Sequence, residues 1–104
     1  MNEIRNESEF NRFRTADRVL VLFYASWCPF SQRFLPIFEE YSRKNSNSYV
    51  FARIDDEPVL CDKYSIEFYP TVICFEKGTM TKRVDSKHGE GLSRKQFEEF
   101  VRSL

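Results

Sequence analysis

The chain has 104 residues, 41% of them hydrophobic and 31% charged, which suits one domain with one core over residues 1–104. Its 16 basic and 16 acidic residues cancel, so no excess of positive charge favours nucleic acid or anionic lipid as a partner. The N-terminus lacks the apolar run of a secretory signal, and no stretch approaches the roughly 20 apolar residues that span a bilayer, so we expect a cytoplasmic protein without a membrane partner.

The first half of the chain predicts a helix, a strand and a second helix, in that order. Ser8 can cap a short helix that carries Phe10. The run Val19–Ala25 has no polar break, as a strand buried on both faces requires. From Pro29 onward the apolar residues change to helical spacing, and Pro36 inside this run predicts a kink.

The second half of the chain predicts three strands and two helices. The last two strands are separated only by Lys77 and Gly78, and so short a connection permits only antiparallel neighbours. Ser93 and Gln96 form a capping-box pattern at the start of the terminal helix. The alternation of strands and helices before them favours parallel strands, so the sequence predicts an α/β fold with a mixed sheet. The predicted strands are Tyr49–Ile54, Thr71–Phe75 and Thr79–Val84, and the predicted helices run from Pro58 to Tyr64 and from Ser93 to Leu104.

Two motifs on this scaffold resemble the thioredoxin family. The segment Trp27-Cys28-Pro29-Phe30-Ser31 stands where a buried strand runs into a helix, and is similar to the active-site segment of that family. The segment Tyr69-Pro70-Thr71 precedes an apolar strand and resembles the family's cis-proline loop. The resemblance covers nearly the whole chain. It implies a thioredoxin fold with a mixed four- to five-stranded sheet flanked by helices on both faces, with Cys28 at a helix N-terminus and Pro70 facing it.

Cys28 is the candidate nucleophile. A thiol exchanges with disulfides only as the thiolate, and the first turn of a helix presents free N–H groups and the positive end of the helix dipole to the sulfur. We therefore expect Cys28 to be reactive; the alternative is an inert cysteine that only fills the loop. Cys61 and Cys74 show no zinc-type pairing, so neither a metal nor a cofactor is expected. Cys74 is interpreted as a core residue, and Cys61 could resolve Cys28 only if their Cα atoms lay within about 7 Å.

The sequence departs from the dithiol thioredoxins at two positions. Ser31 stands where those proteins carry a second cysteine, and a hydroxyl cannot resolve a mixed disulfide because exchange proceeds through sulfur. Leu22 stands where many of them carry a buried aspartate that assists proton transfer at the second cysteine. The two departures agree and predict a monothiol site of the CxxS type. Ser31 either donates a hydrogen bond to the Cys28 thiolate or is an ordinary helix residue.

Apolar residues are expected to line a substrate site beside Cys28. The resemblance implies that a cis Pro70 exposes the backbone of Tyr69, where an extended peptide could pair with it. Trp27, Pro29 and Phe30 would supply further apolar walls, although Phe30 fits ordinary packing equally well.

Five polar residues are interpreted as lying outside the site. Three successive carboxylates, Asp55, Asp56 and Glu57, fit a solvated turn better than an acid–base pair. His88 has no second metal ligand near it in the sequence and is expected at the surface. Arg53 resembles a basic position below the active site of thioredoxins, and is expected to be solvated or paired locally.

The leading interpretation is a thiol–disulfide exchange protein that forms mixed disulfides through Cys28 and is released by an external thiol. Oxidoreductase, isomerase or deglutathionylase-type activity would fit this chemistry. The expected partners are disulfide- or thiol-bearing proteins or a low-molecular-weight thiol, and the protein is expected to be a monomer. The alternative is a redox-inactive module that binds peptides through the aromatic cis-proline surface. A monothiol glutaredoxin role is disfavoured, because Pro29 replaces a glycine of that family's motif and no Gly-Gly-x-x-Asp-like motif follows Phe75.

Overall fold

A computed structural model, which describes residues 1–104, contains five strands and four helices. None of the helices has the length and apolar character needed to cross a membrane. The strands are β1 (Asn2–Ile4), β2 (Val19–Tyr24), β3 (Val50–Asp55), β4 (Thr71–Glu76) and β5 (Thr79–Asp85). The helices are α1 (Glu7–Arg14), α2 (Pro29–Lys44), α3 (Pro58–Lys63) and α4 (Arg94–Arg102).

The five strands form one mixed sheet in the order β1-β3-β2-β4-β5. Strands β1 and β2 run parallel to β3, whereas β4 is antiparallel to both β2 and β5. Strands β4 and β5 meet at Lys77 and Gly78, whose φ angles of 52° and 89° suit a two-residue hairpin turn. The predicted mixed sheet with an antiparallel final pair is therefore confirmed.

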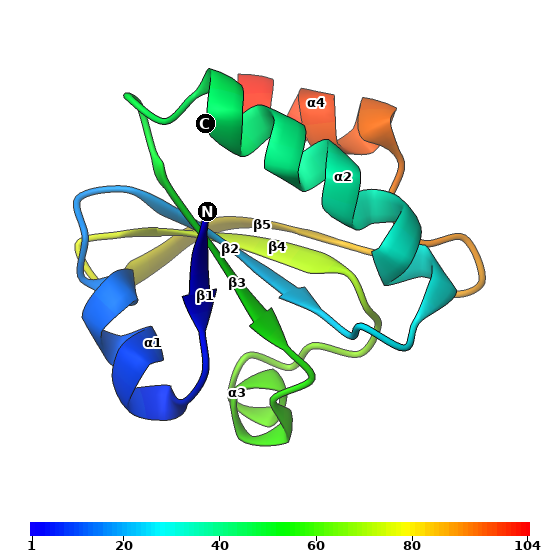
Figure 1. Ribbon diagram of the computed structural model, residues 1–104, viewed down its shortest axis with the longest axis horizontal. Helices are drawn as coiled ribbons and strands as arrows, with labels where there is room; N and C mark the ends of the chain where they lie inside the picture. The colour runs from blue at the N-terminus through cyan, green and yellow to red at the C-terminus, as the bar shows by residue number, and fades with distance from the viewer.

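Strand β2 is buried on both faces, as its unbroken apolar sequence predicts. Alternate residues of this strand enter two separate core clusters, one with α1 and α3 and the other with α2 and α4. Figure 1 shows these two pairs of helices on opposite sides of the sheet. The side chains that face α1 and α3 are Val19, Val21 and Phe23, and those that face α2 and α4 are Leu20, Leu22 and Tyr24.

The N-terminal caps of α1 and α4 test two of the expected helix starts. Asn6, not Ser8, caps α1, and its side-chain oxygen accepts a hydrogen bond from the backbone N–H of Glu9 at 2.9 Å. The expected Ser8 cap is therefore wrong; asparagine caps as well as serine, and Ser8 lies inside the first turn. The capping box of α4 is confirmed, because Ser93 and Gln96 each accept a hydrogen bond from the other's backbone N–H.

Candidate functional site

The Cys28 thiol lies where β2 ends and α2 begins. Cys28 is the N-cap residue of α2, with an extended backbone (φ −89°, ψ 123°), and Pro29 follows as the first helical residue. Proline suits that position because its missing N–H would have no partner in the helix. No side chain caps this first turn, and the Cys28 side chain is half-buried, so the sulfur is open to a substrate.

Ser31 lies three residues along α2 and is fully buried. Its hydroxyl oxygen accepts a hydrogen bond from the backbone N–H of Ala25 at 3.2 Å, which ties the first turn of α2 to the end of β2. The structure contains no hydrogen bond between Ser31 and Cys28, so the Ser31 hydroxyl holds the backbone here rather than the sulfur. Leu22 is fully buried between Arg53 and Val72 in the sheet, and therefore places no ionisable group on β2 below the motif.

A cavity of about 400 Å³ adjoins Cys28. Three predicted site residues, Trp27, Phe30 and Tyr69, line its apolar part, and Trp27 is the most exposed large hydrophobic residue of the chain at 64%. The Tyr69–Pro70 peptide bond is cis, and Pro70 is buried while its carbonyl accepts a hydrogen bond from Ser86. The structure thus brings the two motifs together at one cavity.

Asp56 links the two aromatic walls of this cavity. One of its carboxylate oxygens accepts a hydrogen bond from the Trp27 indole N–H at 3.0 Å, and the other accepts one from the Tyr69 hydroxyl at 3.0 Å. The Trp27 and Tyr69 rings meet edge to face, with centroids 6.3 Å apart. Asp56 therefore fixes the relative position of the two rings that flank the thiol.

The other two carboxylates of the expected solvated turn also have structural partners. Asp55 accepts a hydrogen bond from the backbone N–H of Ser26 at 2.9 Å, and Glu57 caps α3 by accepting one from Leu60 at 2.8 Å. Asp55 and Asp56 are exposed and Glu57 is half-buried, so these residues lie on a solvated turn, as interpreted, and their carboxylates also hold the segments around it. Arg53 has no ion pair, and its guanidinium lies 5.8 Å from the centre of the Tyr24 ring.

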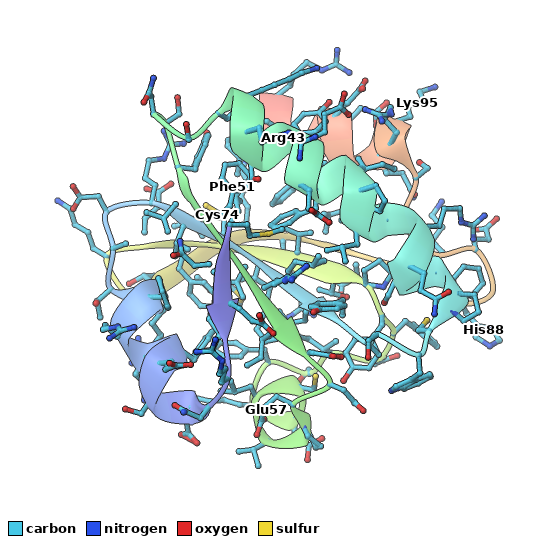
Figure 2. All side chains as sticks on the ribbon, in the orientation of Figure 1. Arg43, Phe51, Glu57, Cys74, His88 and Lys95 are labelled. Carbon is cyan, nitrogen blue, oxygen red and sulfur yellow. The ribbon has the colours of Figure 1, made fainter.

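The loop after β5 supplies site residues that the sequence analysis did not assign to the site. Lys87 and His88 line the cavity beside Cys28, and the His88 ring lies 5.2 Å from that of Phe68. Figure 2 shows His88 at the end of the molecule where α2 begins. Gly91 has a positive φ of 75° and packs so closely on Phe30 that a Cβ atom would lie 2.8 Å from the ring. The spacing of Gly89 and Gly91 in the sequence is a turn signal, but it does not reveal which residues the turn approaches.

Cys61 and Cys74 are both buried thiols, and none of the three cysteines forms a disulfide. Cys74 lies fully buried in β4, as predicted. The Cys61 sulfur lies 3.2 Å from the Tyr69 hydroxyl, which makes it part of the wall behind the site. Burial raises the pKa of both thiols, so both stay protonated at neutral pH and exchange slowly.

We expect a limiting amount of an alkylating reagent to modify Cys28 before Cys61 or Cys74 in the folded protein. The raised pKa of the two buried thiols means that their reaction rates continue to climb at alkaline pH, beyond the pH at which an unburied cysteine is fully ionised. Mass mapping after timed alkylation measures the order. In denaturant the three rates should converge, and modification of Cys61 first in the folded protein would show that the nucleophile is misassigned.

Comparison with known proteins supports the family suggested by these motifs. The sequence model of the family described as Thioredoxin matches residues 2–103. Endoplasmic reticulum resident protein 44 of Bos taurus and of Homo sapiens are each 46% identical over 76 residues, which cover 65% of this chain and 19% of theirs. Protein disulfide-isomerase A5 of Bos taurus is 32% identical over 89 residues, covering 80% of this chain and 17% of that protein. The chain thus spans about a fifth of the length of these curated relatives.

Solved structures of thioredoxins share the fold over nearly the whole chain. Plasmodium falciparum thioredoxin superposes with a TM-score of 0.87 at 21% identity, covering 99% of this chain and 98% of that one. A mutant Entamoeba histolytica thioredoxin has a TM-score of 0.82 at 21% identity, covering 100% of this chain and 99% of its own. With the family model matching residues 2–103, the chain belongs to the thioredoxin family.

Proposed function

We propose that this chain is a monothiol thiol–disulfide exchange domain that captures disulfide-bearing proteins through Cys28. The observation that carries the proposal is a thiol at the start of α2 whose neighbour along the helix, Ser31, is a buried hydroxyl. The Cys28 thiolate attacks one sulfur of the substrate disulfide, and the other sulfur leaves with the bonding electron pair as a thiolate. A new disulfide then joins Cys28 to the substrate.

Release of the captured substrate requires an external thiol. The Ser31 hydroxyl cannot attack sulfur in this way, and the Cys61 thiol is buried against Tyr69 with a raised pKa. An incoming thiolate, from a low-molecular-weight thiol or from a second cysteine of the substrate, attacks the mixed disulfide and returns Cys28 to the thiolate. This chemistry suits disulfide isomerisation or removal of small-thiol adducts better than net reduction.

The test is capture, in the absence of free thiol, of a model protein whose only cysteine is joined by a disulfide to a small leaving group, so that no second substrate cysteine can release it. We expect wild type to accumulate a mixed disulfide visible on a non-reducing gel and to reduce insulin weakly. Cys28→Ser should abolish capture, whereas Cys61→Ala, the matched change at a buried thiol, should leave it unchanged. If Cys28→Ser retained the same substrate as firmly as wild type, the non-covalent peptide-binding module would be the correct function.

The cellular setting stays a prediction. We expect the cytoplasm, whereas the relatives named endoplasmic reticulum resident protein 44 carry a different compartment in their name. Fractionation of cells that express the native protein, followed by detection with an antibody, decides between the two compartments.

A further inference from the structure

A second cavity adjoins the one beside Cys28. It has a volume of about 260 Å³ and is lined by residues of α3 and of the segment that leads to the cis-proline. Glu67, Phe68 and Tyr69 line both cavities, so these three residues form a ridge between them. A peptide bound across this ridge would therefore reach the second cavity from the thiol.

One wall of the second cavity is apolar and held in place. Ile66 and the 38% exposed ring of Phe68 supply apolar surface. The Tyr69 hydroxyl is held at 3.2 Å from the Cys61 sulfur and at 3.0 Å from Asp56, so this wall is fixed from two sides. A fixed apolar wall suits the methylene stem of a long side chain.

Every charged residue that lines this second cavity is acidic: Asp56, Asp62 and Glu67. None of the ion pairs in the structure involves Asp62 or Glu67. The nearby cations are placed elsewhere. Arg83 is bound to Asp85 and to a backbone carbonyl, Lys63 lies over the Tyr64 ring, and Lys87 lines the first cavity without an ion pair to Glu67. The negative charge of this cavity is therefore left for a ligand to neutralise.

We propose that the second cavity is a substrate subsite for a lysine or arginine side chain of the peptide that Cys28 captures. This inference rests on the proposed function, since it assigns a specificity to the same site. The aliphatic stem would lie along Ile66 and Phe68, with the cationic head at Asp62 and Glu67. We place the basic residue two positions from the captured cysteine, because residues two apart in an extended peptide lie on the same face, about 6.6 Å from each other.

The test uses peptides whose single cysteine carries a pyridyl disulfide and whose residue two positions before or after it is lysine, leucine or glutamate. The Cys28 thiolate attacks the peptide sulfur, the sulfur–sulfur bond to the pyridine breaks, and the released pyridinethiolate takes up a proton and absorbs light. We expect the best lysine peptide to react about tenfold faster than its glutamate counterpart, with leucine between them, because charge complementarity acts mainly on association. The difference should shrink in about 1 M salt.

Charge reversal supplies the matched variants. Asp62→Lys and Glu67→Lys together should reverse the preference to glutamate, and both positions are exposed, so the fold tolerates the change. Asp17→Lys makes the same kind of change at an exposed site before β2, at the opposite end of that strand from Cys28, and should leave the lysine preference intact.

An uncharged dipyridyl disulfide separates failure of the subsite from failure of the proposed function. If wild type reacts with that reagent but treats the three peptides alike, or prefers leucine, the basic subsite is wrong while the exchange function stands. If Cys28 reacts with neither the reagent nor any peptide, the proposed function is itself wrong.

Discussion

Replacing Ser31 by cysteine is expected to shorten the lifetime of the mixed disulfide at Cys28 by at least about 100-fold when no thiol is added. The wild-type mixed disulfide then has no accessible thiol to attack it, whereas a well-oriented thiol on the same chain acts at a high effective concentration. Residue 31 lies on the first turn of the helix that Cys28 caps, so the new thiol is close to the sulfur it must attack. Full dithiol efficiency should not follow, because Leu22 offers no proton acceptor below the motif.

The control for this change is Ser31→Ala. It removes the hydrogen bond from Ala25 to the Ser31 hydroxyl without supplying a sulfur, so the mixed disulfide should live as long as in wild type. Lifetimes are measured by quenching a preformed mixed disulfide at intervals and resolving it under non-reducing conditions. Equal lifetimes in Ser31→Cys and Ser31→Ala would mean that residue 31 cannot reach the sulfur of Cys28.

A second arm of the same experiment tests Cys61 as a hidden resolving residue. Its sulfur lies against the Tyr69 hydroxyl, and burial raises its pKa, so we expect no contribution to release. Rapid release by wild type without added thiol, stopped by Cys61→Ala, would contradict the monothiol mechanism.

The elements predicted from sequence are those whose pattern is set locally. The unbroken apolar run of β2, the helical spacing after Pro29 and the capping box at Ser93 each depend on a few neighbouring residues. Strand β1 was not predicted because it has only three residues, of which Ile4 alone is buried. It exists because β3 offers a free parallel edge, with Ile4 opposite Ile54, and the sequence around Ile4 carries no sign of that partner.

The site residues that belong to a recognisable motif could be predicted from sequence. Those that reach the site only because distant segments fold next to it could not. The segments 27–31 and 69–70 could be assigned because each resembles a family motif. The hydrogen bonds of Asp56 were not predicted, because its partners, Trp27 and Tyr69, lie 29 and 13 residues away, and a run of carboxylates looks the same whether or not such donors are present. His88 was placed at the surface, where it lies, but its proximity to Phe68 depends on the path of the loop after β5.

The packing of α4 on α2 leads to the largest stability effect that we expect. Phe97 is fully buried, and its ring meets that of Tyr41 at 5.0 Å and that of Phe34 at 5.2 Å between centroids, both edge to face. Phe38 lies next to it at 5.9 Å. One side chain of α4 thus contacts three aromatic rings of the helix that carries the thiol, so its loss leaves a cavity between the two helices.

Phe97→Ala is expected to lower the free energy of unfolding by about 3 to 5 kcal/mol, from lost burial and the cavity that remains. Because domains of this size are stable by only about 5 to 15 kcal/mol, the variant should unfold at a much lower urea concentration. Phe68→Ala, at a residue that is 38% exposed, is the matched control and should lose far less unfolding free energy.

The first turn of α2 is held separately, by the hydrogen bonds from Ala25 to Ser31 and from Gln32 to Ser26, so folded Phe97→Ala should keep the wild-type alkylation rate at Cys28. A loss of unfolding free energy below about 1 kcal/mol would mean that α4 is not part of the cooperative core, because truncating a fully buried ring in that core should destabilise the fold by more.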